Sequence, residues 1–204
     1  MLQAPLSEAS FTARLHGEIR TGRPLIVTAA EAEAARFDAT CPVLVTGMGK
    51  VRAAMELTRA LSSAQARPRA IVNLGTAGAL KDTLSGIVEV SRVIQHDLPD
   101  DVLHQLSGAH YGRPLTISPS PGATLATGDA FIADGRARTR LAEHADLVDM
   151  EGYAIASVAE RFGVPVRIVK YVSDQADESA QRAWPDAAAE ASGVLADWIR
   201  EHLV

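Results

Sequence analysis

The sequence predicts a single α/β domain built on a mainly parallel sheet. Two observations lead to this prediction. Helical and strand patterns alternate along the chain, as they do in proteins made of successive βα units. The chain has 204 residues, the usual size of one domain, and contains no linker that would divide it, so residues 1–204 are predicted to fold as one unit.

The first part of the chain predicts a helix followed by two strands, a helix and a third strand. Ser7 is a suitable cap for a short helix that would end near Arg20. Apolar runs at residues 24–29 and 42–46 predict two core strands. A glycine turn and a helix with apolar spacing follow at residues 47–61, and another buried strand is predicted at residues 69–73.

The second half of the chain continues this alternation. Strands are predicted at residues 87–95, 124–127 and 165–172. Helices are predicted at residues 150–162, where Gly163 ends the pattern, and at residues 185–202, with Trp184 and Pro185 at the start. Residues 108–122 are rich in Gly, Pro and Ser and predict a loop.

Composition favours a small-molecule ligand. The formal net charge of −5 and the pI of about 5.7 favour neither nucleic acid nor an anionic membrane. No apolar run approaches the ~20 residues that span a bilayer. The single cysteine, Cys41, cannot form an intrachain disulfide, and the first residues lack the features of a secretory signal. The predicted compartment is therefore the cytoplasm.

Two glycine-rich segments follow predicted strands. Gly47 and Gly49 resemble a degenerate dinucleotide fingerprint, but no acid ends the next strand, so a tight turn with close helix packing is the better interpretation. Residues 73–78 end a buried strand, where α/β proteins place ligands. Their two glycines would let a ligand approach the backbone, although a plain turn explains the same pattern.

Six segments, in order along the chain, resemble the methylthioadenosine/adenosylhomocysteine nucleosidases, within the wider nucleoside phosphorylase superfamily. They are VTAAEAEA, GMGKVRAA, IVNLGTAGAL, SGIVEVSRVIQHD, ATGDAFI and DMEGYAIASVAERFGVPVRIVKYVSDQAD. The resemblance implies a three-layer α/β/α sandwich with a mixed, mainly parallel central sheet. It also implies an N-glycosyl hydrolase that needs no cofactor, binds a small purine nucleoside and forms a homodimer.

Cleavage of a purine N-glycosidic bond leaves negative charge on the base and positive charge on the ribose, so acids at both ends of the substrate lower the barrier. By resemblance, Asp174 protonates the purine N7 and Ser173 helps to orient it. A helix cap or a loop acid is the alternative for Asp174.

The sugar and the water are assigned to other acids, again by resemblance. Glu151 accepts hydrogen bonds from the ribose hydroxyls and Met150 packs on the ribose, although an acid at a helix start is also stabilised by the helix dipole. Glu33 activates water, and Glu31 is its rival two residues away. Both glutamates could instead be solvated acids of a helix's first turn.

The remaining substrate contacts are predicted from the glycine-rich strand end and from the GDAFI segment. Thr76 and Gly78 are expected to lie against the substrate. Phe131 and Ile132 are expected to bind the purine, with the aromatic ring stacked on the base. An ordinary core phenylalanine is the alternative for Phe131.

Hydrolysis is favoured over phosphorolysis because a phosphate site usually contains arginine. Phosphorylases of the superfamily typically have arginine where this chain has Asn73. Arg36, Arg52 and Arg92 are near enough in sequence to keep a purine nucleoside phosphorylase as an alternative. A futalosine-type hydrolase is another alternative, though these relatives more often have asparagine at the position of Asp174. A non-catalytic nucleoside-binding protein is the alternative of another class.

Two regions are shorter than the family usually shows. They are residues 33–47 and 112–126, which in the family surround the 5′ side of the sugar and the subunit contact. The 5′ substituent is therefore left open.

A group of histidines and acids raises the question of a metal site. His96, Asp97, Asp101, His104 and His110 fall within fifteen residues of sequence. Their spacing matches no standard ligand pattern. No metal is predicted, and a polar loop near a subunit interface is the better interpretation.

Overall fold

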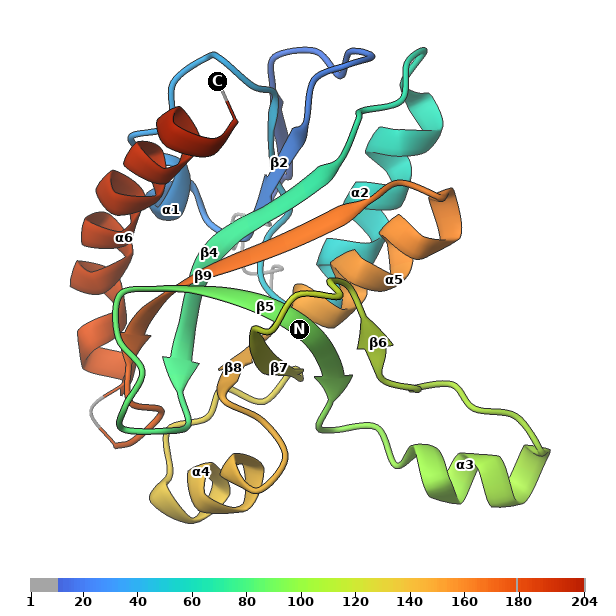
Figure 1. Ribbon diagram of the computed structural model, residues 1–204, viewed down its shortest axis with the longest axis vertical. Coiled ribbons are helices and arrows are strands. Elements are labelled where there is room, and N and C mark those ends of the chain that lie inside the picture. Colours follow the sequence, from blue (N-terminus) through green and yellow to red (C-terminus); the bar gives the residue numbers. More distant parts are fainter. Residues whose placement is uncertain (1–10, 179, 204) are drawn as a thin grey trace, which may run out of the picture.

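The computed structural model describes residues 11–178 and 180–203, and all strands in this part of the chain belong to one sheet (Figure 1). The strands are β1 (Arg14–His16), β2 (Leu25–Thr28), β3 (Val43–Val45), β4 (Ile71–Ala79), β5 (Ile87–Gln95), β6 (Leu115–Thr116), β7 (Ala123–Thr127), β8 (Leu147–Asp149) and β9 (Val166–Asp174). The helices are α1 (Glu31–Ala34), α2 (Lys50–Ser63), α3 (Asp100–Ser107), α4 (Gly135–Ala142), α5 (Gly152–Phe162) and α6 (Ala180–His202). Because one sheet joins these strands, we infer a single domain.

The sheet is mixed and partly closed. Strands β2, β3 and β4 pair in parallel, and β4 also pairs in parallel with β9. From β9 the sheet continues through β5, β7 and β8, and β8 pairs back onto the end of β4, so that five strands form a ring. In this ring Gly78 is the partner of both Val148 and Asp174. The carboxyl ends of β4 and β9 therefore meet beside the short strand β8.

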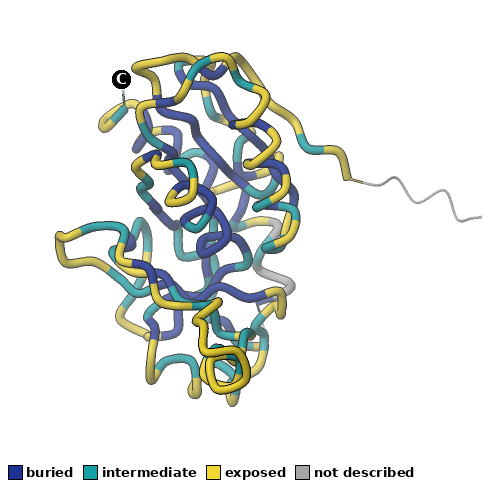
Figure 2. Tube along the Cα trace, turned by 90° about the vertical axis from the view of Figure 1, so that its right-hand side faces the viewer, coloured by how far each residue is buried: buried dark blue, intermediate teal, exposed yellow. Residues whose placement is uncertain are grey.

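Helices cover both faces of the sheet and give the three layers that the resemblance implied, which confirms the fold class. Helices α2 and α5 pack together on one face, with Leu57 and Ile155 in their shared core. Helices α1 and α6 lie on the other face, where Leu195 and Trp198 of α6 are buried. Figure 2 shows buried residues running through the middle of the molecule, with exposed residues around them.

The predicted N-terminal helix is wrong where the structure describes it. Ser7, its predicted cap, lies outside the described residues. Arg14 to His16 form the short strand β1, which pairs antiparallel with β3. The pairing satisfies backbone groups that β3 would otherwise leave open at the sheet edge, and this long-range gain outweighs a local helical pattern.

The glycine-rich stretch after residue 73 is also not a turn, because β4 continues to Ala79 and pairs with β9 along its length. The glycines make room for two acids. A Cβ on Gly75 would lie 3.1 Å from Glu33 Oε1, and a Cβ on Gly78 would lie 3.1 Å from Asp174 Oδ1. Both acids can therefore approach the strand only because these side chains are absent.

Most other predicted elements are confirmed within a few residues. The tight turn before α2 is confirmed, because Gly47 and Gly49 have φ angles of 85° and 93°. Helix α6 begins at Ala180, earlier than predicted, and the predicted loop at residues 108–122 contains the short strand β6. No described helix combines the length and the apolar character that crossing a bilayer requires.

Candidate active site

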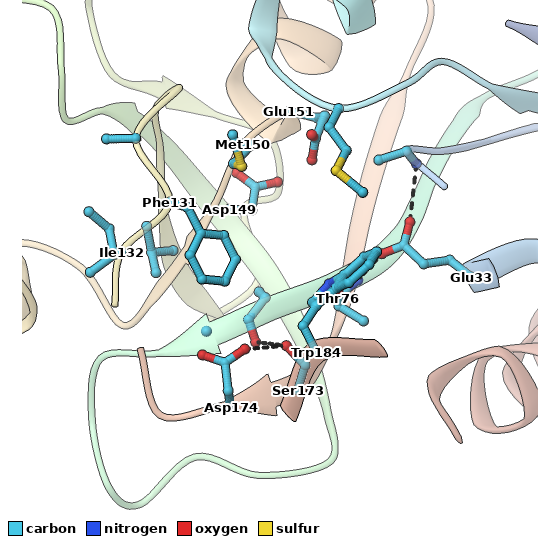
Figure 3. A pocket seen from close by; sticks show the side chains of 16 residues that line it. Glu33, Thr76, Phe131, Ile132, Asp149, Met150, Glu151, Ser173, Asp174 and Trp184 are labelled. Carbon is cyan, nitrogen blue, oxygen red and sulfur yellow. Dashed lines mark hydrogen bonds between the residues drawn. The ribbon is translucent and has the colours of Figure 1, made fainter. Parts of the chain in front are cut away.

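A cavity of about 330 Å³ opens where β4, β8 and β9 end. All nine residues predicted to act on the substrate line it (Figure 3): Glu33, Thr76, Gly78, Phe131, Ile132, Met150, Glu151, Ser173 and Asp174. Residues from all parts of the described chain meet here because the partly closed sheet brings their strand ends together. The size suits a small-molecule ligand.

One end of the cavity combines an acid with an apolar wall. Asp174 is the last residue of β9, and its Oδ2 accepts a hydrogen bond from Ser173 Oγ at 2.6 Å. Its Oδ1 accepts one from the backbone N–H of Ala176 at 2.8 Å. Phe131 and Ile132 lie across the cavity from Glu33 (Figure 3). A flat base could lie against these apolar side chains while its edge meets the Asp174 carboxyl.

Hydrogen bonds and one ion pair hold the segment that carries Phe131 against the start of α2. Asp129 Oδ1 accepts a hydrogen bond from the backbone N–H of Lys50 at 2.8 Å. Asp97 accepts one from the backbone N–H of Asp129 at 2.9 Å and also pairs with Lys50 Nζ at 2.5 Å. Asp97, considered above as a metal ligand, therefore has a structural partner.

Glu151 lies between β8 and α5 and is buried. Its Oε1 accepts a hydrogen bond from the backbone N–H of Gly49 at 2.7 Å, so the glutamate contacts the start of α2 and does not cap its own helix through its side chain. Burial raises the pKa of Glu151 to about 8, with a further contribution from Asp149, while Lys170 and the Gly49 N–H oppose the rise. Glu151 therefore holds a proton more readily than an exposed glutamate does.

A buried ion pair lies next to Glu151 and was not predicted. Lys170 of β9 is only 1% exposed, and its Nζ lies 2.8 Å from Asp149 Oδ2. Asp149 also accepts hydrogen bonds from Thr127 Oγ1 at 2.6 Å and from the backbone N–H of Gly152 at 2.8 Å. Burial disfavours the charged amine, but the carboxylates of Asp149 and Glu151 raise the pKa of Lys170 above its ordinary value.

Glu33 occupies the opposite end of the cavity from Phe131 and is only 3% exposed. Its Oε2 accepts hydrogen bonds from Thr28 Oγ1 at 2.8 Å and from the backbone N–H groups of Ala29 and Ala30 at 3.2 and 3.1 Å. Its Oε1 accepts two from Thr76, one from N–H and one from Oγ1, both at 2.8 Å.

The structure also separates Glu33 from its rival. Glu31 is exposed, and its carboxylate pairs with Arg14 and His16 at 3.4 Å. It does not line the cavity, so of the two glutamates only Glu33 can reach a ligand there.

The described residues that line the cavity include neither arginine nor lysine. Asn73 is buried and its Nδ2 donates to the carbonyl oxygen of Val27 at 3.0 Å, so it does not face the cavity. Arg36, Arg52 and Arg92, which the sequence left as phosphate ligands, are absent from the lining as well.

Two of the three histidines in the group considered as a metal site contact each other. His104 and His110 stack at 4.0 Å, and His110 Nδ1 lies 2.8 Å from Asp100 Oδ2. Within residues 11–178 and 180–203, no group of three or more His, Cys, Asp or Glu side chains is arranged to hold a metal ion.

Apart from three alanines and Val148 of the lining, four residues of the site were not predicted. Asp149, Met48 and Trp184 line the cavity, and Lys170 supports it from the core. Asp149 directly precedes Met150 at a strand end, which was a usable signal. Trp184 is one of only two tryptophans and lies eleven residues after Ser173, but nothing local indicated that its side chain turns back to the sheet.

Comparisons with known proteins agree with this arrangement. The chain matches the Phosphorylase superfamily over residues 18–124 and 122–201. It is 30% identical over 164 residues to the 5′-methylthioadenosine/S-adenosylhomocysteine nucleosidase of Shewanella oneidensis, covering 68% of this chain and 69% of that protein. It is 29% identical over 171 residues to the nucleosidase of the same name from an Exiguobacterium species, covering 71% of each chain.

Solved structures show the same fold at lower identity. The Helicobacter pylori 5′-methylthioadenosine/S-adenosylhomocysteine nucleosidase superposes with a TM-score of 0.75 at 19% identity, covering 91% of this chain and 98% of that one. A futalosine hydrolase mutant of the same species superposes with a TM-score of 0.72 at 19% identity, covering 90% and 100%. Sequence and fold together place this chain in the phosphorylase superfamily, as a member of its 5′-methylthioadenosine/S-adenosylhomocysteine nucleosidase family.

Proposed function

We propose that the chain hydrolyses the N-glycosidic bond of adenine nucleosides such as 5′-methylthioadenosine or S-adenosylhomocysteine and releases adenine. The names of the relatives supply these substrates. The observation that carries the proposal is the placement of Asp174 and Glu33 at different ends of one cavity. Such a pair can protonate a leaving base and activate a water.

These positions support the following reaction. The bond between C1′ and N9 breaks and its electron pair goes to the purine, which takes the proton of Asp174 at N7. The oxygen of water bonds to C1′, and the proton that it loses goes to the carboxylate of Glu33. Phe131 and Ile132 hold the base, and Ser173 holds the Asp174 carboxyl in place through its 2.6 Å hydrogen bond.

The charge of the site suits a ribose that becomes positive as the bond breaks. Asp149 and Glu151 lie beside the sugar position, and Lys170 is the cation buried among them. The Asp149 carboxylate, fixed in a largely buried site by Thr127 and the Gly152 N–H, stabilises developing positive charge without reorganisation, whereas the raised pKa of Glu151 favours its neutral form. Glu151 would bind the ribose hydroxyls and Met150 would pack on the ring.

Water suits this site better than phosphate. The hydroxyl and backbone N–H donors of residues 28–30 and Thr76 form a cradle that would bind an anion, but the Glu33 carboxylate already occupies it. None of the described residues that line the cavity is arginine or lysine. A phosphate ion would meet a carboxylate at close range, which repels it.

Base release decides this proposal. Purified protein is incubated with 5′-methylthioadenosine, S-adenosylhomocysteine, adenosine and inosine, with and without phosphate, and free base is measured. We expect adenine release that does not depend on phosphate. Release that requires phosphate would make the chain a phosphorylase, and nucleoside binding without any release would make it a binding protein.

The raised pKa of Glu151 predicts how stability depends on pH. Because this pKa rises from its ordinary 4.5 to about 8, the folded chain keeps a proton that the unfolded chain loses, so stability falls as pH rises between these values. Glu151→Gln stays neutral throughout. Relative to wild type it should gain up to about 1.4 kcal/mol of unfolding free energy per pH unit over this interval.

Urea unfolding at several pH values between 5 and 8 measures this difference. Glu160→Gln is the matched control, since Glu160 lies on the same helix but is exposed and pairs with Arg113. A stability difference between Glu151→Gln and wild type that stays constant with pH would contradict the prediction.

A second copy of the chain is the proposed protein partner. Met48, Val51 and Met55, here named the α2 patch, are exposed apolar side chains spaced three and four residues apart. A hollow of about 560 Å³ between α2 and α5 adjoins them. An exposed apolar face of this kind marks a contact surface, and two-fold dimers are the commonest assemblies.

The double substitution Val51→Glu and Met55→Glu should convert a dimer into monomers, because it buries two charges in the contact. Light scattering coupled to size-exclusion chromatography measures the mass. Thr139→Glu, on exposed α4, is the control that adds charge elsewhere. A wild-type protein that is monomeric at all concentrations would refute the dimer.

We also propose the cytoplasm as the compartment, because the buried Cys41 is a free thiol.

A further inference from the structure

Within the part of the chain that the structure describes, five donors fix the carboxylate of Glu33. Three of them are backbone N–H groups, from Ala29, Ala30 and Thr76, which the sheet and α1 hold in place. The fourth is the hydroxyl of Thr28, which is fully buried. The fifth is the hydroxyl of Thr76, at the cavity wall. It is the member of this set that both lines the cavity and can rotate.

Trp184 contacts this rotating hydroxyl. Its indole Nε1 donates a hydrogen bond to Thr76 Oγ1 at 2.9 Å, and Thr76 Oγ1 donates in turn to Glu33 Oε1 at 2.8 Å. Trp184 lies near the start of α6 and lines the cavity beside Glu33 (Figure 3). An indole N–H can only donate, and a hydroxyl has one proton. While the indole donates to the Thr76 oxygen, the hydroxyl proton therefore points to Glu33.

We infer that Trp184 is a positioning residue for the water step, acting through the Thr76 hydroxyl on Glu33. The inference rests on the proposed function, in which Glu33 takes the proton of water. A free threonine hydroxyl could turn and accept the hydrogen of the water itself, and it is a poor base. With its proton directed to Glu33 and its oxygen engaged by the indole, Thr76 leaves the carboxylate as the acceptor for that hydrogen.

Trp184→Phe tests this relay, since it keeps an aromatic ring at the cavity wall and removes only the indole N–H. We expect kcat for adenine release to fall about three- to tenfold, the effect of one net hydrogen bond, with KM unchanged. Trp198→Phe is the matched control, because Trp198 of α6 is the other tryptophan, is buried against His202 of the same helix and Arg167 of β9, and does not line the cavity. It should leave kcat at the wild-type value.

A double-mutant cycle separates the relay from simple packing. Thr76→Val also breaks the relay, so adding Trp184→Phe to it should cause no further loss of kcat. Independent, multiplicative losses would show that Trp184 acts only as a wall of the cavity, and would overturn the inference.

Nuclear magnetic resonance tests the hydrogen bond between Trp184 and Thr76 without a measurement of catalysis. The protein has two indole N–H signals, and the Trp184→Phe variant identifies which one belongs to Trp184. Thr76→Val should move the Trp184 signal and leave that of Trp198 in place; an unmoved Trp184 signal overturns the inference. Wild-type kcat in Trp184→Phe also overturns it while the proposed function stands. If the wild type releases no base from any nucleoside, the proposed function fails, and the role in the water step fails with it.

Discussion

Replacing Asp174 by asparagine is expected to lower kcat for adenine release about 10²- to 10⁴-fold, the usual contribution of a general acid. The amide has the shape of the carboxyl: its oxygen can still accept the hydrogen bond from the Ala176 N–H, and its NH2 group can donate to Ser173 Oγ, which donates to Asp174 in the wild type. It has no proton that it can give to N7 of the leaving purine. The affinity for the product adenine, measured by calorimetry, should change far less than kcat.

A substrate whose leaving group needs no protonation distinguishes the loss of the general acid from a general disturbance of the active site. The leaving group of a 4-nitrophenyl riboside departs as a stable phenolate and needs no proton from Asp174. We expect the Asp174→Asn variant to lose much less activity on this substrate than on an adenine nucleoside. Equal losses on both substrates would contradict the role of Asp174 as the acid.

Asp197→Asn is the control for this substitution. Asp197 lies on α6, is exposed and pairs with Arg200, so its loss should leave adenine release at the wild-type rate. A large loss in this control would show that Asp→Asn changes act on this protein through stability rather than through chemistry.

The sequence predicted the parts of the site that depend on where strands end. Asp174 follows an apolar run that predicts a core strand, and ligands meet α/β sheets at strand carboxyl ends, whereas Met150 was expected only at the start of a helix and β8 before it was not predicted. The family resemblance then supplied their roles. Glu33 was separable from Glu31 only in three dimensions, where one glutamate turns inward to Thr76 and the other pairs with Arg14 on the surface.

What escaped prediction depends on contacts between distant segments. The sheet closes through β4 and β8 because Gly78 pairs antiparallel with Val148, and no local sequence pattern predicts this pairing. Lys170 lies in the middle of an apolar strand, where a lysine suggests an exposed position. Its burial could not be predicted, because it depends on Asp149, which is twenty-one residues earlier in the chain. The turn of Trp184 toward Thr76 depends in the same way on how α6 packs on the sheet.

The buried pair gives the second large expected effect. Lys170→Met should lower the free energy of unfolding by about 3–5 kcal/mol, the cost of leaving one charge of a buried pair without its partner. Methionine replaces most of the length of the side chain, so lost packing contributes little. The penalty arises because Asp149 and Glu151 then lie together in the core without a cation. Urea unfolding near neutral pH measures it.

An exposed ion pair provides the matched control. Lys81 pairs with Asp146 at 2.6 Å, but the lysine side chain is about half exposed. Lys81→Met should therefore cost at most about 1 kcal/mol, as surface pairs generally do. A similar loss for both lysines would show that burial does not set the strength of the Lys170 pair.

The double variant Asp149→Asn and Lys170→Met identifies the cause of the loss. The oxygen of asparagine can still accept the hydrogen bond from the Gly152 N–H, and its NH2 group can donate to Thr127 Oγ1, but the amide carries no charge that needs a cation. If the unpaired carboxylate causes the loss, the double variant should recover most of the stability that Lys170→Met removes, because a buried pair replaced as a whole by neutral groups costs little. If the double variant is no more stable than Lys170→Met alone, the lysine stabilises the core by packing. Recovered stability together with slow adenine release would instead mean that the pair is kept for the charge that it places beside the ribose.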